Sequence, residues 1–188
     1  RITRDGDRLR IDFAEADAPA TYRVIARPEY VAFELIELSG APVDRIDLLC
    51  LQLTGLPRRG AWVNFAFDEP FGVCLCAGNV QTNAEMDQTA DHVVLRAAAE
   101  RTVGLEGAVA VLFGCPDPQT RFLERMAAVE RDFHMPSGAA NRRHPDQRLS
   151  YLWASRPTPE NIGEYIQLAK RGGFRMILFS YNAFATSA

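Results

Sequence analysis

The chain has 188 residues, of which 47% are hydrophobic and 24% are charged; these proportions are typical of a globular protein with a substantial core and exclude a disordered chain. The formal net charge is −3, so no basic field is present to attract nucleic acid or an anionic membrane surface. The chain also lacks the run of ~20 apolar residues that a membrane-spanning helix needs, and we therefore expect neither nucleic acid nor a membrane among its partners.

The first hundred residues consist of short apolar or alternating segments separated by turn residues. The earliest turn is Asp5-Gly6-Asp7, and it precedes an alternating segment in which Leu9 and Ile11 share one face. Short strands at fairly regular spacing, with turns between them, are typical of a β-sandwich. We expect these strands within residues 4–13, 21–27, 30–38, 43–55, 61–67, 72–79 and 91–100.

Two segments of this region carry more specific expectations. Residues 43–55 have apolar side chains at both alternating sets of positions, which predicts a central strand covered on both faces. Residues 80–89 are polar, and we expect a loop there.

The character of the sequence changes after Gly104. Residues 107–116 form a continuous apolar run that predicts a buried strand. Residues 117–133 place Phe122, Met126 and Val129 at helical spacing, with Leu123 broadening the apolar stripe. Residues 134–148 contain two prolines, a glycine and few apolar side chains, which predicts an exposed linker and the best domain boundary.

The last forty residues predict a helix followed by a buried strand. After a short strand-like piece at residues 149–156, Thr158 is expected to cap a helix that ends at Gly172-Gly173. The apolar run 174–179 follows at once, as in the parallel sheets of α/β folds. Because one strand cannot make a sheet, its partners are expected from the remainder of the same polypeptide, from another subunit, or from an upstream strand.

We therefore predict a mostly β protein in three parts. Residues 1–115 form a β-sandwich domain, residues 116–148 a helix and an exposed linker, and residues 149–188 the incomplete start of an α/β, TIM-type barrel.

The cysteines and histidines predict no metal site. Cys74 and Cys76 would point to the same face of one strand, and with Cys50 and Cys115 they are interpreted as buried, reduced thiols. The three histidines have no carboxylate at a ligand spacing and belong to no zinc-protease motif. We expect no cofactor, no metal and no catalytic residue in this chain.

Aromatic side chains give the best candidates for ligand contact. Trp62, Tyr151 and Trp153 could stack on sugar rings, although core positions are the more common interpretation for the two tryptophans. Tyr181 and Asn182 differ because they follow a buried parallel strand, and the carboxyl ends of such strands are where α/β folds place ligand contacts. We therefore predict Tyr181 and Asn182 as substrate-binding residues.

The segment LSYLWASRPTPENIGEYIQLAKRGGFRMILFSYNAF resembles the start of the catalytic barrel in bacterial multidomain glycoside hydrolases of the α-galactosidase-like kind. In that family an N-terminal β-sandwich precedes a (β/α)₈ barrel, and the upstream segment VGLEGAVAVLFGCP is similar to the sandwich-to-barrel connection. The resemblance implies a hydrolase acting on glycosidic bonds, with its catalytic carboxylates on later strands.

Three functions stay open on this evidence. The chain is expected to be the non-catalytic N-terminal part of a carbohydrate-active hydrolase, with a carbohydrate ligand. The alternatives are a β-sandwich module that binds carbohydrate or protein without catalysis, and a complete small α/β enzyme in which the strands near Ala110 and Ile177 are adjacent in one parallel sheet. No signal peptide is visible and Arg1 is not an initiator methionine, which is compatible with a cytoplasmic or a secreted protein.

Overall fold

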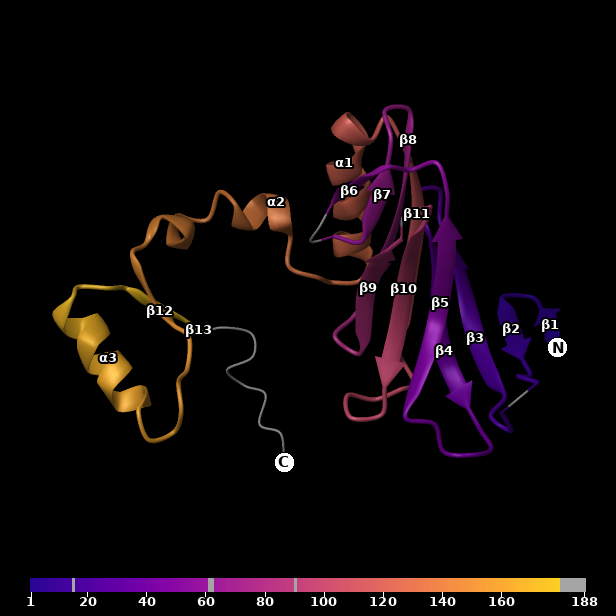
Figure 1. Ribbon diagram of the computed structural model, residues 1–188, viewed down its shortest axis with the longest axis horizontal. Helices are drawn as coiled ribbons and strands as arrows, with labels where there is room; N and C mark the ends of the chain where they lie inside the picture. Colours follow the sequence, from indigo (N-terminus) through magenta and orange to yellow (C-terminus); the bar gives the residue numbers. More distant parts are fainter. Residues whose placement is uncertain (15, 61–62, 90, 180–188) are drawn as a thin grey trace. The chain divides into compact units, whose positions relative to one another are not determined.

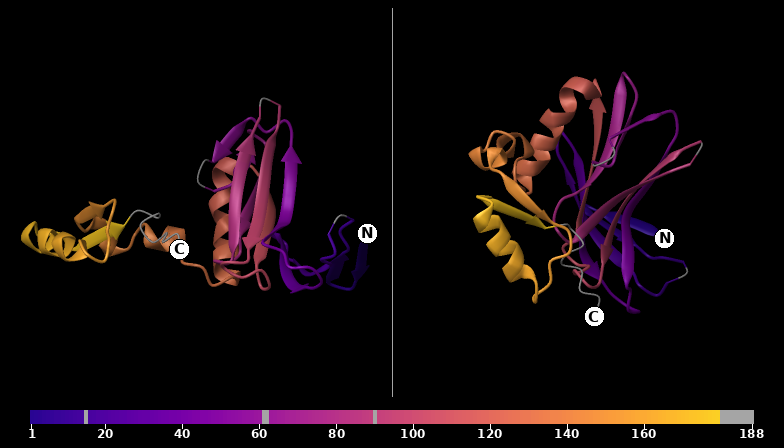
Figure 2. Two further views of the ribbon diagram at one scale, coloured as in Figure 1. Left: turned by 60° about the horizontal axis from the view of Figure 1, so that its bottom comes forward. Right: turned by 60° about the vertical axis from the view of Figure 1, so that its left-hand side comes forward.

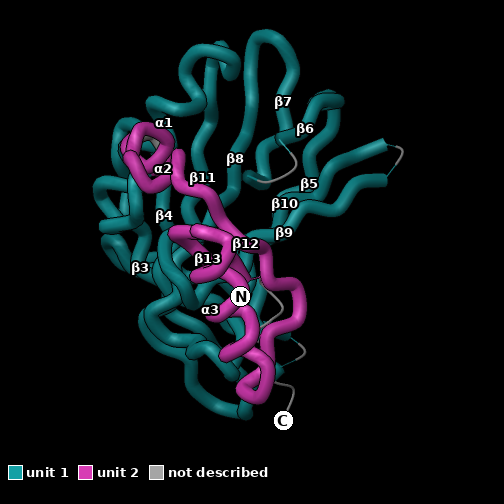
Figure 3. The backbone as a smooth tube through the Cα atoms, turned by 90° about the vertical axis from the view of Figure 1, so that its left-hand side faces the viewer, with its two compact units in different colours: residues 1–137 teal, residues 138–188 magenta. Residues whose placement is uncertain are grey.

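The computed structural model describes residues 1–14, 16–60, 63–89 and 91–179. The chain divides into two compact units, Arg1–Ser137 and Gly138–Ala188 (Figure 3). The first unit is built from antiparallel sheets, so the prediction of a mostly β protein is confirmed. Among the described residues, no helix is long and apolar enough to cross a membrane.

The first unit contains two antiparallel sheets (Figure 1). The larger sheet has eight strands in spatial order: β1 (Ile2–Asp5), β2 (Arg8–Ile11), β3 (Ala20–Ala26), β4 (Val31–Leu38), β11 (Val109–Pro116), β8 (Phe71–Ala77), β7 (Phe65–Phe67) and β6 (Arg58–Gly60). The smaller sheet has three strands in the order β5 (Arg45–Leu53), β10 (Val93–Glu100) and β9 (Thr82–Gln88).

Two hydrophobic cores lie on opposite faces of the larger sheet. The first core fills the space between the two sheets and includes Tyr22, Leu35 and Leu95. The second core lies between the larger sheet and helix α1 (Pro118–Asp132), where Phe113 and Val129 are buried. The first unit is therefore a β-sandwich with a helix on its outer side, and the two views in Figure 2 show this order of layers.

Strand β11 explains why residues 107–116 are apolar without interruption. Ala110 and Leu112 face the core between the sheets, whereas Val111 and Phe113 alternate with them and face α1. A strand that is covered on both faces has no position for a polar side chain, so the prediction of a buried strand is confirmed.

Strand β5 is an edge strand, and the prediction that it is central and covered on both faces is wrong. In its register with β10, Asp47 faces Ala98 and Leu49 faces Ala97, so Leu48 is an extra residue that forms a β-bulge. The bulge reverses the alternation: Ile46 and the bulged Leu48 face the core, and beyond the bulge Leu49 and Leu51 face the core. Because of this reversal, apolar residues occupy both alternating sets of positions in the sequence, although only one face of the strand is buried.

The polar segment 80–89 is not a loop but contains strand β9, so that prediction is also wrong. Thr82, Ala84 and Met86 are on one face of this strand, with Met86 against the core, while Glu85 and Asp87 are on the outer face. The period of two was present in the sequence, but short inward side chains gave it little hydrophobic contrast.

Helix α1 begins at Pro118 as expected and packs on β11, so it belongs to the first compact unit rather than to a separate connection. Phe122 lies against the rings of Phe65 and Phe113, at centroid distances of 4.4 and 5.9 Å. Leu123, by contrast, is 62% exposed, so its expected part in the apolar stripe is not found.

The exposed segment predicted at residues 134–148 contains two short helical pieces, α2 (Gly138–Asn141) and a 3₁₀ helix (Pro145–Arg148). The second unit then contains a strand–helix–strand motif: β12 (Tyr151–Ala154), α3 (Ile162–Arg171) and β13 (Met176–Phe179). Strands β12 and β13 pair in parallel, with Leu152 opposite Ile177. The strand-like piece at residues 149–156 therefore supplies a partner for the last strand, which is the upstream source among the three that were expected.

Strand β11 pairs with β4 and β8 and not with β13, so the adjacency of the strands near Ala110 and Ile177 is wrong. Helix α3 ends at its expected glycines but begins at Ile162 with Asn161 as its N-cap, so the prediction that Thr158 caps the helix is wrong; Thr158 instead starts the turn that leads into it. The Thr158 carbonyl accepts from the Ile162 N–H at 3.0 Å and its Oγ1 from the Asn161 N–H at 3.3 Å. Gly173 ends the helix with φ +69°, a conformation that favours glycine.

We expect Phe122→Ala and Leu123→Ala to differ sharply, although the two residues are neighbours on α1. Phe122→Ala removes a ring from the second core and should lower the free energy of unfolding by about 3 kcal/mol. Leu123→Ala should change it by less than ~0.5 kcal/mol because that side chain is exposed. Urea unfolding followed by circular dichroism measures both values, and equal losses would contradict this packing of α1.

Candidate functional site

The two residues predicted to bind substrate, Tyr181 and Asn182, lie outside the described residues, as does Trp62. Their roles therefore stay predictions. Strand β13, which precedes Tyr181 and Asn182, is described up to Phe179 and pairs with β12. These two strands therefore show the surroundings of the predicted site.

Strands β12 and β13 present an aromatic face. Tyr151 and Trp153 alternate with the buried Ala154, so they point to the opposite side of the strand, where they are 49% and 59% exposed. In register they stand beside Met176 and Leu178, which share their side of the sheet. We call these four residues the aromatic face. A buried core position is the more common interpretation of a tryptophan such as Trp153, but in the second unit this side chain is exposed.

The aromatic face offers flat apolar rings to the solvent. Two side chains at positions i and i+2 of a strand lie about 7 Å apart on the same face. The C–H groups on one side of a pyranose pack on a flat apolar ring, and the edges of tyrosine and tryptophan retain a polar group for hydrogen bonding.

The loop after the carboxyl end of β12 is fixed by side-chain hydrogen bonds. The Asn161 amide donates to the Arg156 carbonyl at 3.1 Å and accepts from the Thr158 N–H at 2.7 Å. A hydrogen bond with the Thr158 side chain also lowers the pKa of the exposed Glu160.

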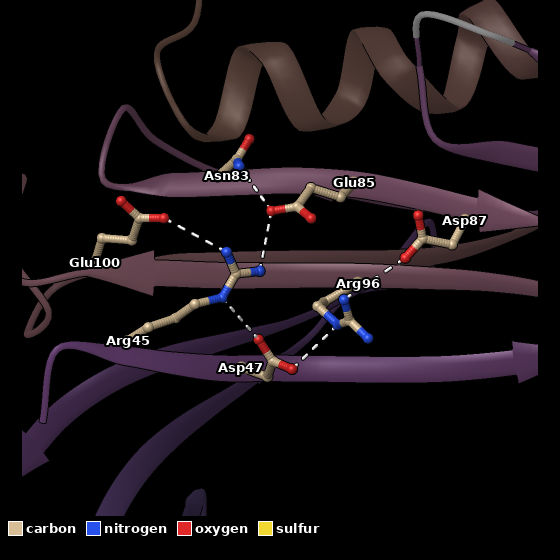
Figure 4. A network of polar contacts seen from close by, with 7 residues as sticks. All are labelled: Arg45, Asp47, Asn83, Glu85, Asp87, Arg96 and Glu100. Carbon is tan, nitrogen blue, oxygen red and sulfur yellow. Dashed lines mark hydrogen bonds and ion pairs between the residues drawn. The ribbon is translucent and has the colours of Figure 1, made fainter.

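A second polar cluster covers the outer face of the smaller sheet (Figure 4). Arg45 lies within ion-pair distance of Glu85 at 3.0 Å, Glu100 at 3.4 Å and Asp47 at 3.5 Å. Glu85 and Asp47 raise the pKa of the Arg45 guanidinium, the hydrogen bond with Glu85 most of all. We call this cluster the charge network; its members are Arg45, Asp47, Asn83, Glu85, Asp87, Arg96 and Glu100.

Arg96 is the second cation of the charge network. Its Nε lies 3.1 Å from Asp47 Oδ2, an ion-pair distance without hydrogen-bond geometry, and its Nη1 lies 3.6 Å from Asp87. Sequence reasoning missed the network because it assigned Glu85 and Asp87 to a loop, and because side chains from three strands converge only once the register is known.

The four cysteines differ in exposure: Cys50 is exposed, Cys76 is partly buried, and Cys74 and Cys115 are buried. Cys50 is exposed on β5, so the expectation of four buried thiols is wrong at this position. Cys74 and Cys76 share one face of β8 as expected, and with Cys115 they belong to the core under α1. The hydrogen bond with Cys76 and burial raise the pKa of Cys74 well above its usual value, and burial raises that of Cys115.

No group of three or more His, Cys, Asp or Glu side chains that could hold a metal is found in the described part of the chain. His92 Nδ1 lies 2.9 Å from the Thr89 hydroxyl, and the His144 ring accepts from the Asp146 N–H. Both are local contacts within turns, and they bring no nucleophile and carboxylate together.

No protein-family model matches this chain, and a search of curated proteins finds no match to it.

We expect Arg45→Gln to lower the free energy of unfolding by about 1 kcal/mol in low salt. The change removes three exposed ion pairs and leaves Asp47, Glu85 and Glu100 to repel one another. In ~0.5 M NaCl the loss should shrink by at least half because the charges are screened. Arg58→Gln, which removes one pair with the exposed Glu69, is the control and should cost less than ~0.3 kcal/mol. A loss for Arg45→Gln that does not depend on salt contradicts the electrostatic account.

Thiol titration tests the assignment of the cysteines. At pH 8, a disulfide reagent such as DTNB should modify Cys50 in a fast phase, and Cys50→Ser should remove that phase. Cys74 and Cys115 should react only after unfolding in urea, because a raised pKa keeps them protonated at this pH and burial keeps the reagent out. Cys76 is only partly buried, and its hydrogen bond with Cys74 lowers its pKa, so the control replaces both Cys50 and Cys76 by serine. A fast phase that survives in this double variant would show that the core under α1 is open.

Proposed function

We propose that this chain is the N-terminal, non-catalytic part of a carbohydrate-active hydrolase that acts on glycosidic bonds. In this proposal the β-sandwich is an accessory domain, and β12, α3 and β13 are the first strand–helix–strand unit of a (β/α)₈ barrel. The observation that carries the proposal is the parallel pairing of β12 and β13, which follow an antiparallel sandwich along the chain.

The exposure of the aromatic face supports the proposal. Parallel sheets are almost always covered on both faces, and two strands alone do not form an independently stable sheet. In a barrel, helices cover the outer face of each strand, and the opposite face forms the interior. The buried Ala154 and the exposed Tyr151 and Trp153 fit those two faces.

The positions within β12 assign different roles to the two aromatic residues. Tyr151 begins the strand and stands beside Met176, where barrel interiors are filled by layers of packed side chains. Trp153 is nearer the carboxyl end, where barrel enzymes bind their substrates. Trp153 is therefore proposed to line the sugar site together with Tyr181 and Asn182, while the carboxylates that cleave the bond belong to later strands.

The experiment is an assay of the polypeptide encoded by the natural gene, its length first fixed by intact-mass measurement. We expect a protein that continues past residue 188 and hydrolyses nitrophenyl glycosides. Trp153→Ala should reduce kcat/KM at least about tenfold, which is ~1.4 kcal/mol of transition-state binding. Phe71→Ala removes an aromatic ring that is 43% exposed on the sandwich, and it should leave kcat/KM unchanged.

The outcomes separate the three functions. A natural protein that ends at Ala188 and is a soluble monomer without glycosidase activity overturns the hydrolase proposal. Sugar binding by such a protein, lost in Trp153→Ala, would assign it to the carbohydrate-binding modules. Activity of the 188-residue chain on a substrate other than a glycoside would support a complete small α/β enzyme.

A further inference from the structure

The two sheets of the first unit differ in width, and strand β5 lies where the smaller sheet stops. Strands β3, β2 and β1 continue the larger sheet beyond β5, and Figure 1 shows them extending past it. Leu9 and Ile11 of β2 turn toward the core between the sheets but are only partly buried. Strands β3, β2 and β1 are therefore a part of the larger sheet that the smaller sheet does not cover, and one more strand could lie over them beside β5. We call these three strands the shelf.

The open edge of β5 carries unused backbone groups. The Arg101 N–H donates to the Asp44 carbonyl, and hydrogen-bonded pairs alternate with non-hydrogen-bonded pairs in an antiparallel ladder. Arg45 and Asp47, paired in register with Glu100 and Ala98, therefore direct their N–H and C=O groups away from β10. Among the described residues, no backbone hydrogen bond reaches this edge of β5.

A cavity of about 400 Å³ lies beside Arg45, Ile46 and Asp47 of β5. Its volume is ample for one or two aliphatic side chains. Apart from Arg45 and Asp47, its lining is apolar: Phe13, Ala16, Ala18, Leu38, Val43 and Ile46. An apolar cavity adjacent to a free strand edge is the combination that strand-addition sites use, in which main-chain hydrogen bonds give affinity and side-chain pockets give specificity.

The charge network defines the outer side of this groove. It contains four carboxylates and two guanidinium groups, which leaves an excess of negative charge over the outer face of the sheet. A strand added to β5 would place alternate side chains on that face, next to Arg45 and Asp47. A lysine or arginine next to Asp47 would meet its carboxylate directly, whereas Glu85 and Asp87 lie two strands away on β9 and attract it only at longer range.

A second copy of the chain does not fit the groove. Antiparallel pairing of two β5 strands requires a two-fold axis perpendicular to the smaller sheet, which leaves both larger sheets on the same side. Strands β3 to β1 of each copy would then occupy the space of the other copy's larger sheet. Only an extended segment without its own second layer can reach the edge.

We propose that the groove between β5 and the shelf of β3–β1 binds an extended peptide segment of a protein partner, in which apolar residues alternate with basic ones. The segment adds a fourth strand to the smaller sheet beside Arg45–Asp47. An apolar side chain fills the cavity, and the basic side chains lie against the charge network. This peptide site is independent of the carbohydrate proposal.

The test uses the 188-residue chain and a fluorescent peptide of about seven residues in which valine alternates with lysine. We expect a Kd of about 10–100 μM at low salt by fluorescence anisotropy, and slower hydrogen exchange at the Arg45 and Asp47 amides. The same peptide N-methylated at alternate backbone nitrogens, or with glutamate for lysine, should bind at least about tenfold more weakly.

Matched variants place the peptide in the cavity. Ala16→Trp fills the cavity from an exposed loop position and should weaken binding at least about tenfold. Ala14→Trp, on the same loop but outside the cavity lining, should keep the affinity within about twofold. Circular dichroism confirms that both variants fold, and the comparison of peptides on the unmodified chain does not depend on them.

Several outcomes overturn the proposal. Equal affinity for the N-methylated peptide would exclude strand addition, and failure to bind at about 1 mM would exclude a useful site. Protection of the Arg45 and Asp47 amides by self-association, or by an oligosaccharide instead of the peptide, would assign the groove to a different occupant. Loss of glycosidase activity in the natural protein has no bearing on these measurements, so the two proposals fail separately.

Discussion

The structure of the first unit depends on the burial of one sheet on both of its faces. Strands β11 and β8 send alternate side chains into two different cores, one shared with the smaller sheet and one shared with α1. Because most positions of these strands are covered on both faces, they carry no charged side chain. Close contacts also fix their small residues: a Cβ at Gly72 would lie 2.5 Å from the Phe65 ring. The smaller sheet and α1 are both attached to this central layer, so both depend on the register of β11 with β8.

The strength of the local pattern decided how far the sequence could predict the fold. Strand β11, helix α1 and helix α3 were predictable because each has a long apolar run or clear helical spacing. In addition, Pro118 marks the start of α1 and Gly173 lies just after the end of α3. Strand β9 was not predictable, because its inward residues include a threonine and an alanine, which give little hydrophobic signal in the sequence. Their inward position is set by the pairing of β9 with β10. The bulge at Leu48 is likewise a property of the pairing with β10, and no residue of β5 marks it alone.

The candidate sites differ in the same way. The aromatic face could be anticipated from the alternation of Tyr151 and Trp153, although their exposure follows only from the parallel register with β13. The charge network could not, because Arg45, Glu85 and Arg96 are far apart in the sequence and meet on adjacent strands. A side-chain cluster that spans several strands can be predicted only when the strand register is known, and that register depends on packing against the second sheet.

The bulge in β5 also determines what its open edge can bind. A long flat edge invites indiscriminate pairing, and proteins commonly interrupt such edges with bulges and charged side chains. The bulge at Leu48 twists β5 away from regular pairing, but Arg45–Asp47 precede it and keep regular backbone geometry beside the cavity. The usable edge is therefore only a few residues long, and affinity must come from the cavity and the charge network as much as from main-chain hydrogen bonds. The bulge thus shortens the edge that is open to pairing, and the proposed selectivity for one pattern of side chains follows from that short length.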